Sequence, residues 1–284
     1  MFGAPRFCYQ ERNRDRQISM MTTNPFADER LVTNIEDCYF YHTMDVPGHG
    51  VIEGEWDLRA NIGNYLGGYN FQGRRVLDVG AASGLLTFFA EKKGASVVSY
   101  DLSEHHSWDV VPYADADQTQ IDTTRRQHMR RINNAYWLCH RLLGSRATAS
   151  YGSVYDIPET IGPVDVSVFG SILLHLRDPF LALSSAAKVT KSTIIVADVC
   201  PFGRLGQLMN NPRFIPNPSR RSPWDTWWNL PPRLIQKYLA ILGFPQSDVT
   251  WHRQLYQKKQ RTLYTVVGRR VDTDAPMLKT AHSV

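Results

Sequence analysis

The sequence predicts an α/β fold built on a doubly wound, mostly parallel, seven-stranded sheet that ends in an antiparallel hairpin. Three observations predict it. From residue 75 to residue 200, short apolar runs alternate with helical patterns every ~20–30 residues, which is typical of parallel strands covered by helices on both faces. A turn of small residues follows the first of these runs. Two later apolar runs are separated by the polar segment 257–260, which indicates a hairpin.

The first strand, turn and helix are the clearest elements of the pattern. Residues 76–79 form a short apolar run, and residues 80–84 are small. Residues 84–93 carry apolar side chains at helical spacing, which predicts a helix. Residues 96–100 predict the next strand, which Asp101 closes.

The later elements follow from periodicity. Residues 122–143 have apolar side chains at 3-4-3-4 spacing, which predicts a long amphipathic helix with a solvated arginine-rich face. The other expected strands lie near 147–151, 164–169, 193–198, 248–253 and 262–268, and the other expected helices near 55–66, 178–189 and 232–242.

Length and composition limit the class of protein. The chain has 284 residues, enough for one large domain or two small ones at about 150 residues each. Hydrophobic residues make up 43% and charged residues 21%, which excludes a wholly disordered or fibrous protein. No run approaches the ~18 apolar residues of a membrane span. The four cysteines are far apart, which argues against a disulfide framework or a zinc site and favours the cytoplasm.

We expect the chain to be organised in four parts. Residues 1–30 are expected to be a disordered leader, because no apolar signal core lies among their arginines. Residues 31–70 are expected to form an N-terminal cap segment, and residues 71–270 the main domain. Within that domain, residues 201–231 are rich in Pro, Asn and Arg and are expected to be an insertion, and residues 271–284 a flexible tail.

Charge is distributed unevenly. The formal net charge is +5, yet residues 201–270 contain twelve Lys and Arg against Asp225 and Asp248, a local net charge of +10. Such a region can attract an anionic partner, and RNA is one candidate. The simpler interpretation is a solvated basic surface, since no nucleic-acid-binding motif accompanies it.

The turn at residues 80–84 points to an adenosine-containing ligand. Ligands of open parallel sheets bind beyond the carboxyl ends of the strands, where the strand order reverses. Gly80, Ala82 and Gly84 permit close backbone approach. Asp101, about twenty residues on, is placed to accept hydrogen bonds from ribose hydroxyls. A dinucleotide fingerprint would require glycine at position 85, which is Leu85, and no P-loop follows.

These residues resemble a known family. Residues 76–84, V-L-D-V-G-A-A-S-G, are similar to the first motif of class I S-adenosylmethionine (SAM) dependent methyltransferases, with Ala82 at the middle glycine. Residues 152–157 resemble the segment that flanks adenine, and residues 169–179, with the form L-x-H-L-x-D-P, resemble the fourth motif. The likeness covers residues 70–270 and implies a Rossmann-like fold with SAM as cofactor and S-adenosylhomocysteine (SAH) as product.

A narrower likeness concerns one branch of that family. The stretch L-L-H-L-R-D-P, together with residues 228–231 and 242–244, looks like the branch that contains tRNA wobble-uridine carboxymethyltransferases. The long N-terminal extension of those enzymes is missing here, so we carry over the methyltransferase scaffold and not the tRNA substrate.

The resemblance implies a set of cofactor-binding residues. Asp101 would hold the ribose or, alternatively, cap a helix. Asp156 would meet the adenine amino group or simply start a turn before a proline. Asp78 would organise the turn that receives the methionine moiety or satisfy backbone amides. The full expected set is Asp78, Gly80, Ala82, Gly84, Asp101, Leu102, Tyr155, Asp156 and Gly170.

The residues that would contact the methyl acceptor are less clearly indicated by the sequence. His175 lies just past the fourth parallel strand, where it would serve as general base or brace its loop; histidine titrates near neutral pH, which suits proton removal. His42 is expected to contact substrate from the cap segment, which also carries Asp45, His49 and Glu53; the alternative for each is an ordinary polar loop residue. Trp224 and Trp228 are expected to form an aromatic wall for the substrate, with core packing as the alternative. No metal-ligand spacing occurs among these residues, so we expect no metal site.

These observations predict a SAM-dependent methyltransferase that moves a methyl group to an O or N nucleophile of a small molecule. In such a reaction the protein mainly orients the nucleophile in line with the S–CH₃ bond. Two alternatives stay open: an RNA methyltransferase that uses the basic region at 201–270, and a non-catalytic SAM-binding module.

Overall fold

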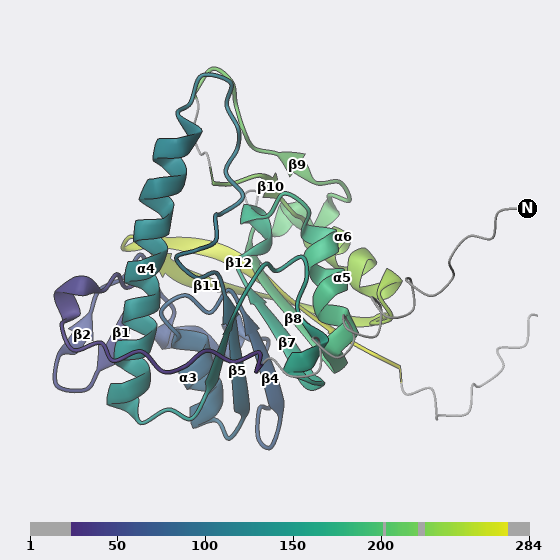
Figure 1. Cartoon of the computed structure of the whole chain (residues 1–284). Helices are drawn as coiled ribbons and strands as arrows, with labels where there is room; N and C mark the ends of the chain where they lie inside the picture. Colours follow the sequence, from purple (N-terminus) through teal and green to yellow (C-terminus); the bar gives the residue numbers. More distant parts are fainter. Residues whose placement is uncertain (1–23, 201–202, 221–224, 272–284) are drawn as a thin grey trace, which may run out of the picture.

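The computed structural model describes residues 24–200, 203–220 and 225–271 (Figure 1). Its centre is an eight-stranded sheet with the order β3-β11-β12-β8-β7-β4-β5-β6. The five strands from β8 to β6 are mutually parallel, whereas β12, β11 and β3 run antiparallel to their neighbours. The strand bounds are β3 Trp56–Asp57, β4 Arg75–Val79, β5 Ser96–Asp101, β6 Thr148–Tyr151, β7 Val164–Gly170, β8 Thr190–Val199, β11 Gln246–Tyr256 and β12 Lys259–Arg269.

The strand order reverses beside β4. This strand pairs with β5 on one side and with β7 on the other, so the chain winds outward in both directions from it. The reversal leaves a switch point at the carboxyl ends of β4 and β7, which is the position where open parallel sheets bind ligands. The predicted doubly wound sheet is therefore confirmed.

Helices cover both faces of the sheet, as expected for parallel strands. On one face, α5 and α6 contribute Leu183 and Ile235 to a core cluster with β7 and β8. On the other face, α2 and α3 contribute Tyr65 and Leu86. The helix bounds are η1 Ile35–Asp37, η2 Arg59–Asn61, α2 Ile62–Tyr65, α3 Leu85–Lys92, α4 Gln118–Leu143, η3 Glu159–Ile161, η4 Leu173–His175, α5 Pro179–Val189, η5 Gly203–Leu208 and α6 Pro232–Ile241.

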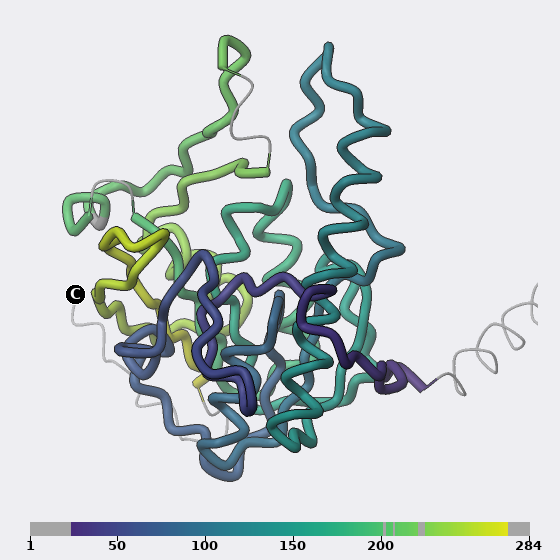
Figure 2. The backbone as a smooth tube through the Cα atoms, turned by 90° about the vertical axis from the view of Figure 1, so that its left-hand side faces the viewer, coloured from purple at the N-terminus to yellow at the C-terminus, as the bar shows by residue number. Residues whose placement is uncertain are grey.

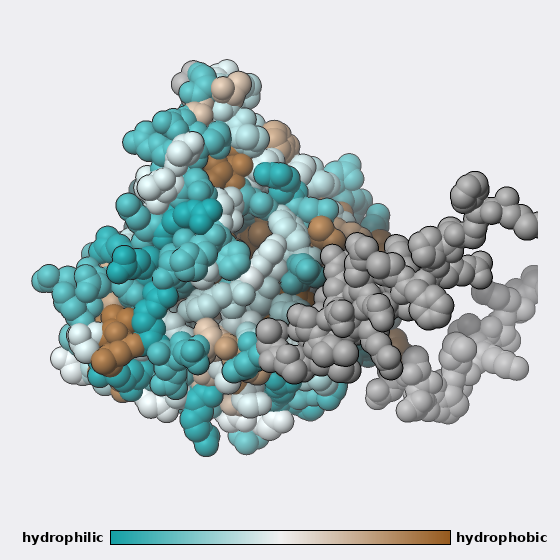
Figure 3. Space-filling model, viewed as in Figure 1, coloured by the Kyte–Doolittle hydropathy of each residue, from teal (hydrophilic) through white to brown (hydrophobic). Residues whose placement is uncertain are grey.

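The long helix α4 is capped at both ends. The Asp117 side chain accepts a hydrogen bond from the Gln120 amide at 3.0 Å, and Gly144 ends the helix in the left-handed conformation. Its amino-terminal half projects above the sheet, beside the segment that carries β9 (Arg213–Phe214) and β10 (Trp228–Asn229), and Figure 2 shows the two projections from the side. The side of α4 seen in Figure 3 is largely hydrophilic, in agreement with the exposed Gln127 and Arg130.

The N-terminal segment runs along α4 in the opposite direction. Backbone bonds join the Tyr39 amide to the Arg131 carbonyl at 2.9 Å and the Ala27 amide to the Ala149 carbonyl at 2.8 Å. Residues 24–30 of the expected leader therefore contact the body of the protein. Residues 1–23 and most of the expected tail lie outside the described residues.

Two local expectations are wrong in detail. The helix expected at 55–66 is interrupted: β3 pairs with β11 through Asp57 and Leu255, and only η2 and the short α2 follow. This pairing adds the eighth strand to the seven expected. The cap segment also holds a hairpin that was not predicted, β1 (Met44–Val46) with β2 (Gly50–Ile52). The C-terminal hairpin is confirmed, with its turn at Gln257 and Lys258, both in the left-handed conformation.

The helices of the described residues differ from a membrane span in length or in composition. The longest helix among them is α4, with 26 residues. Neither α4 nor any other helix of the described part combines the length and the apolar composition needed to cross a bilayer.

Candidate functional site

The turn between β4 and α3 lies at the switch point and adopts a conformation that suits glycine. Gly80 has φ 75° and Gly84 has φ 90°. Ala82 adopts φ 48°, although an alanine side chain disfavours this left-handed region by about 1–2 kcal/mol. The turn is tied to β5, because the Gly80 amide donates to the Tyr100 carbonyl at 2.8 Å. Ala82 therefore adopts a backbone conformation that glycine usually occupies.

Asp101 faces this turn from the end of β5. One carboxylate oxygen accepts from the Ala82 amide at 2.7 Å, and the other accepts from the Leu102 amide at 2.7 Å. Burial raises the pKa of Asp101 to about 6, against the lowering effect of the two amides. Each ionised oxygen can accept a further hydrogen bond. The structure thus joins Asp101 to the backbone of Ala82 and of Leu102.

Asp78 is directed into the interior below the turn. It is 1% exposed, and one oxygen accepts from the Thr87 hydroxyl at 2.7 Å. The chain of hydroxyls continues through Ser99 to Tyr136, at 2.8 and 2.9 Å. The second oxygen, Oδ1, has no hydrogen-bond partner among the described residues, and burial raises the pKa of Asp78 to about 7. Asp78 therefore fastens α3 beneath the turn through Thr87.

The space beside the glycines of the turn is filled by protein side chains. A Cβ on Gly80 would lie 2.6 Å from Cδ1 of Ile172, and a Cβ on Gly84 would lie 2.4 Å from the Phe88 ring. Gly170, at the end of β7, is similarly close to Leu86, at 2.7 Å. These glycines serve close packing in this structure, and a ligand that approached Gly80 would displace the Ile172 side chain.

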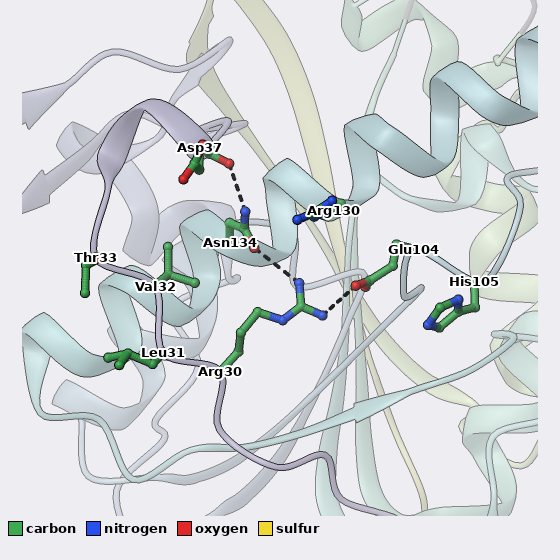
Figure 4. Close-up of a pocket in the computed structure, with 9 residues that line it drawn as sticks. All are labelled: Arg30, Leu31, Val32, Thr33, Asp37, Glu104, His105, Arg130 and Asn134. Atoms are coloured by element: carbon green, nitrogen blue, oxygen red, sulfur yellow. Dashed lines mark hydrogen bonds and ion pairs between the residues drawn. The ribbon is translucent and has the colours of Figure 1, made fainter.

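Neither of two described cavities is lined by Gly80 or Asp101. One, of about 580 Å³, is bounded by the N-terminal segment, the loop after β5 and α4 (Figure 4). In it, Arg30 donates to Glu104 at 2.7 Å and to Asn134 at 3.2 Å, so it joins all three elements. The other, of about 620 Å³, lies between α2 and α3 and includes Tyr69 and Lys93.

The segment expected to flank adenine is held by loop contacts. The Tyr155 hydroxyl donates to the Asp109 carboxylate and accepts from the Asp178 amide at 3.1 Å. The same carboxylate accepts from the Arg177 amide at 2.7 Å. Asp156 is exposed, and its amide closes a turn onto the Ser153 carbonyl at 3.1 Å. Tyr155 thus joins three loops, whereas Asp156 is the last residue of a turn that begins at Ser153.

His175 lies in η4, just after β7, and contacts the segment before β10. Its Nδ1 lies 2.5 Å from the Asp225 carbonyl oxygen. A carbonyl oxygen only accepts, so Nδ1 carries the proton and neutral His175 keeps the lone pair on Nε2. The half-buried Trp228 donates through its indole to the Arg177 carbonyl at 3.2 Å and packs against Phe214. Trp224 lies outside the described residues.

His42 covers the turn from the cap segment. It is 6% exposed, and its amide lies 3.4 Å from the hydroxyl of Ser83, the fourth residue of the turn. Its Nδ1 has no partner among the described residues, and burial lowers the pKa of His42 to about 4. The other polar residues expected as alternatives in this segment, Asp45, His49 and Glu53, are exposed.

Sequence reasoning missed Asp198, at the carboxyl end of β8. It is 1% exposed, its Oδ2 has no partner among the described residues, and burial raises its pKa to about 7. Nearby, Ser171 adopts φ 53° and its hydroxyl lies 3.0 Å from that of Tyr65. The signal that could have found Asp198 is the one used for Asp101: an acid closing an apolar parallel strand.

The basic region at 201–270 does not behave as one free patch. Its described members lie on η5, β9, α6, β11 and β12 and the loops that join them. Arg269 pairs with Asp248 at 2.5 Å, and Lys258 pairs with Glu53 at 3.0 Å. Arg270 donates to two backbone carbonyls. The described positive charges are therefore divided among several surfaces.

Comparison with known proteins gives fold-level likeness. No protein-family model and no curated protein matches the chain. Magnesium protoporphyrin IX methyltransferase (ChlM) from Synechocystis PCC 6803 with bound SAH is 13% identical over 75% of this chain and 82% of that chain, with a TM-score of 0.47. The N-terminal domain of EvdMO1, in the presence of SAH and D-fucose, is 16% identical over 95% and 100%, with a TM-score of 0.48.

A third solved structure is 1,6-didemethyltoxoflavin-N1-methyltransferase from Burkholderia thailandensis with bound 1,6-didemethyltoxoflavin and SAH. It is 14% identical over 75% of this chain and 76% of that chain, with a TM-score of 0.45. At these identities and TM-scores, the likenesses carry no argument about what this chain does.

Proposed function

We propose that this protein binds SAM at the carboxyl ends of β4 and β5 and transfers its methyl group to an O or N nucleophile of a small molecule. The observation that carries the proposal is the hydrogen bond that the Ala82 amide donates to the Asp101 carboxylate at 2.7 Å. It joins an acid that can accept from ribose hydroxyls to a tight, glycine-like turn at the switch point of a parallel sheet.

The residues present fit the cofactor. The ribose would bind the free lone pairs of Asp101, and the methionine part would lie over the turn at Gly80 after Ile172 moves. Leu102 and residues 152–156 would bound the adenine side. His42 and Ser83 would close the turn from above, where the buried imidazole is neutral and therefore does not repel the sulfonium.

The mechanism follows from the charge of the cofactor. When bound, SAM supplies an activated methyl group with a neutral leaving group. The chain therefore has to orient the acceptor and exclude water, and such orientation lowers barriers by about 7–11 kcal/mol. His175 would take the proton of a hydroxyl or ammonium acceptor on Nε2, because its Nδ1 proton faces the Asp225 carbonyl.

The cofactor assignment is tested by calorimetric titration of SAM and SAH into the wild type and Asp101→Ala. A hydrogen bond to a charged group contributes about 1.5–3 kcal/mol, so we expect the dissociation constant to rise by about tenfold to a hundredfold. Asp122→Ala is the matched control, since Asp122 pairs with Arg126 on the surface of α4. Equal affinity of wild type and Asp101→Ala would refute the ribose assignment.

The reaction is tested by transfer of labelled methyl from SAM to a metabolite panel and to total RNA. Label in a small molecule supports the proposal. Label in RNA, with binding that weakens steeply as salt rises, would replace it by an RNA methyltransferase. SAM binding without any transfer would indicate a non-catalytic module. With the acceptor found, His175→Ala should lower turnover more than SAM affinity.

A further inference from the structure

A continuous series of contacts leads from α4 to the imidazole of His175. The Arg125 guanidinium pairs with the Asp225 carboxylate at 3.2 Å, and the Asp225 carbonyl oxygen lies 2.5 Å from Nδ1 of His175. Arg125 is held in turn by Trp108, with its guanidinium carbon 4.3 Å from the ring centre. One aspartate therefore connects the ion pair, through its side chain, with the histidine, through its backbone.

The ion pair is sheltered from solvent. The side chain of Arg125 is 13% exposed and that of Asp225 is 28% exposed, whereas the Arg126–Asp122 pair on the same helix is 42% and 35% exposed. Exposed ion pairs contribute little to stability and cannot fix a backbone strongly. Loss of one partner from a sheltered pair leaves a poorly solvated charge, so the two side chains hold each other.

The neighbouring residue supplies a second anchor, but at another point of the segment. The Trp227 amide donates to the Leu174 carbonyl at 2.8 Å, and its indole donates to the Asp109 carbonyl at 2.6 Å. These bonds fix residue 227. The carbonyl of Asp225 lies two residues earlier, and its orientation depends on the backbone torsions of Asp225 itself. The Asp225 side chain, which Arg125 holds at 3.2 Å, restrains those torsions.

We propose that Arg125 and Asp225 are positioning residues that hold His175 as the Nδ1-protonated tautomer, with Nε2 free to accept a proton. This inference rests on the proposed function only in giving that lone pair a use as general base. Arg125 acts on His175 through Asp225. The geometry assigns it a role that neither the motif around residue 175 nor the cofactor turn contains.

The tautomer is measured directly by nitrogen-15 NMR of the histidine rings in the full-length protein at pH 8. The signals of His175, one of nine histidines, are identified by their loss in His175→Gln. In the wild type we expect a protonated Nδ1 and an unprotonated Nε2. In Asp225→Asn and Arg125→Met we expect loss of the single Nδ1–H pattern and appearance of the Nε2–H tautomer. Arg125→Lys, which keeps the positive charge, should retain the wild-type pattern in part.

Arg126→Met is the matched control, since it removes an arginine and an ion pair from the next position of the same helix and should keep the wild-type pattern. If Arg125→Met does not fold, Asp225→Asn decides, because it keeps the shape of the side chain. Retention of the Nδ1–H pattern in the variants that fold would overturn the proposal, as would its absence from the wild type.

Calorimetric titration of SAM on the same samples separates the two proposals. We expect SAM affinity within about twofold of the wild type in every variant, because Asp101 and the turn are not altered. A wild type that shows the Nδ1–H pattern and does not bind SAM would refute the proposed function and leave the positioning of His175 standing. A wild type that binds SAM and lacks the pattern would do the reverse.

Discussion

Replacement of Asp78 by Asn is expected to stabilise the protein relative to the wild type as the pH rises. Asp78 is 1% exposed, and among the described residues Thr87 is the one side chain that donates to it, at 2.7 Å. Burial raises its pKa to about 7, whereas aspartate in an unfolded chain ionises near pH 3.9. The folded protein therefore keeps this proton over a range in which the unfolded chain releases it.

The sign and size follow from that difference. Because the folded state binds the extra proton, the contribution of Asp78 to stability is complete below pH 4 and falls as the pH rises toward 7. The shift is about three pH units at about 1.36 kcal/mol each, or about 4 kcal/mol in total. Between pH 5 and pH 8.5 the unfolding free energy of the wild type should fall by about 3 kcal/mol through Asp78. Asp78→Asn, which has no proton to release at this position, should lose none of that free energy.

The assay is urea unfolding of both proteins at pH 5, 7 and 8.5, with the difference in unfolding free energy taken at each pH. Thr87→Val provides a second variant. The hydrogen bond from the Thr87 hydroxyl lowers the pKa of Asp78, so its removal should raise that pKa further and make the unfolding free energy fall more steeply with pH. A difference between wild type and Asp78→Asn that stays constant within about 0.5 kcal/mol would refute the reasoning. Such a constant difference is what an Asp78 carboxylate already ionised in the folded protein at pH 5 would give.

Three other predictions concern the turn and its cover. Gly84→Ala should reduce the unfolding free energy by at least about 2 kcal/mol, since φ is 90° and the new Cβ would meet the Phe88 ring at 2.4 Å; a loss below about 0.5 kcal/mol in urea unfolding would contradict this. Ala82→Gly should change stability by less than about 1 kcal/mol, because relief at φ 48° offsets the greater freedom of the unfolded chain, and thermal unfolding checks it. Burial lowers the pKa of His42 to about 4, so its contribution to stability is present above pH 6.5 and is lost as the pH falls toward 4. Between pH 7 and pH 4 the wild type should therefore lose about 3 kcal/mol of unfolding free energy that His42→Gln does not lose, which urea unfolding at both pH values measures. An equal loss in the two proteins would argue against a neutral buried imidazole.

Periodicity and turn chemistry were sufficient for most of the sheet. The apolar run at 76–79, the small turn after it and Asp101 at the end of the next strand are all local features, and β4, β5 and the turn between β4 and α3 follow them. The same applies to α4, whose apolar stripe is confirmed, although the helix begins at Gln118, four residues before the expected 122. Local patterns are sufficient to predict these elements, because the hydrogen bonds of a helix close within four residues and β4 and β5 pair within one strand–helix–strand unit.

The parts that were mispredicted depend on distant partners. Residues 56–57 have a helical neighbourhood in the sequence, but Asp57 pairs with Leu255 on β11. That pairing joins residues about two hundred positions apart, and no local sequence pattern predicts it. The filling of the turn by Ile172 and Phe88 is likewise a packing result, since it depends on which side chains tertiary structure brings over the glycines.

The contrast between the two halves of the site has the same origin. The bond from Ala82 to Asp101 spans 19 residues and belongs to one strand–helix–strand unit, so a single motif encodes it. The bonds that orient His175 span 50 residues to Asp225 and a further 100 from there to Arg125. Substitutions at these distant positions can therefore alter the protonated nitrogen of His175 while the turn and Asp101 stay unchanged. Under the proposed function, the turn that would bind the cofactor and the histidine that would serve the acceptor therefore depend on different segments of the chain. Substitutions could change the acceptor chemistry and leave the cofactor motif recognisable in the sequence.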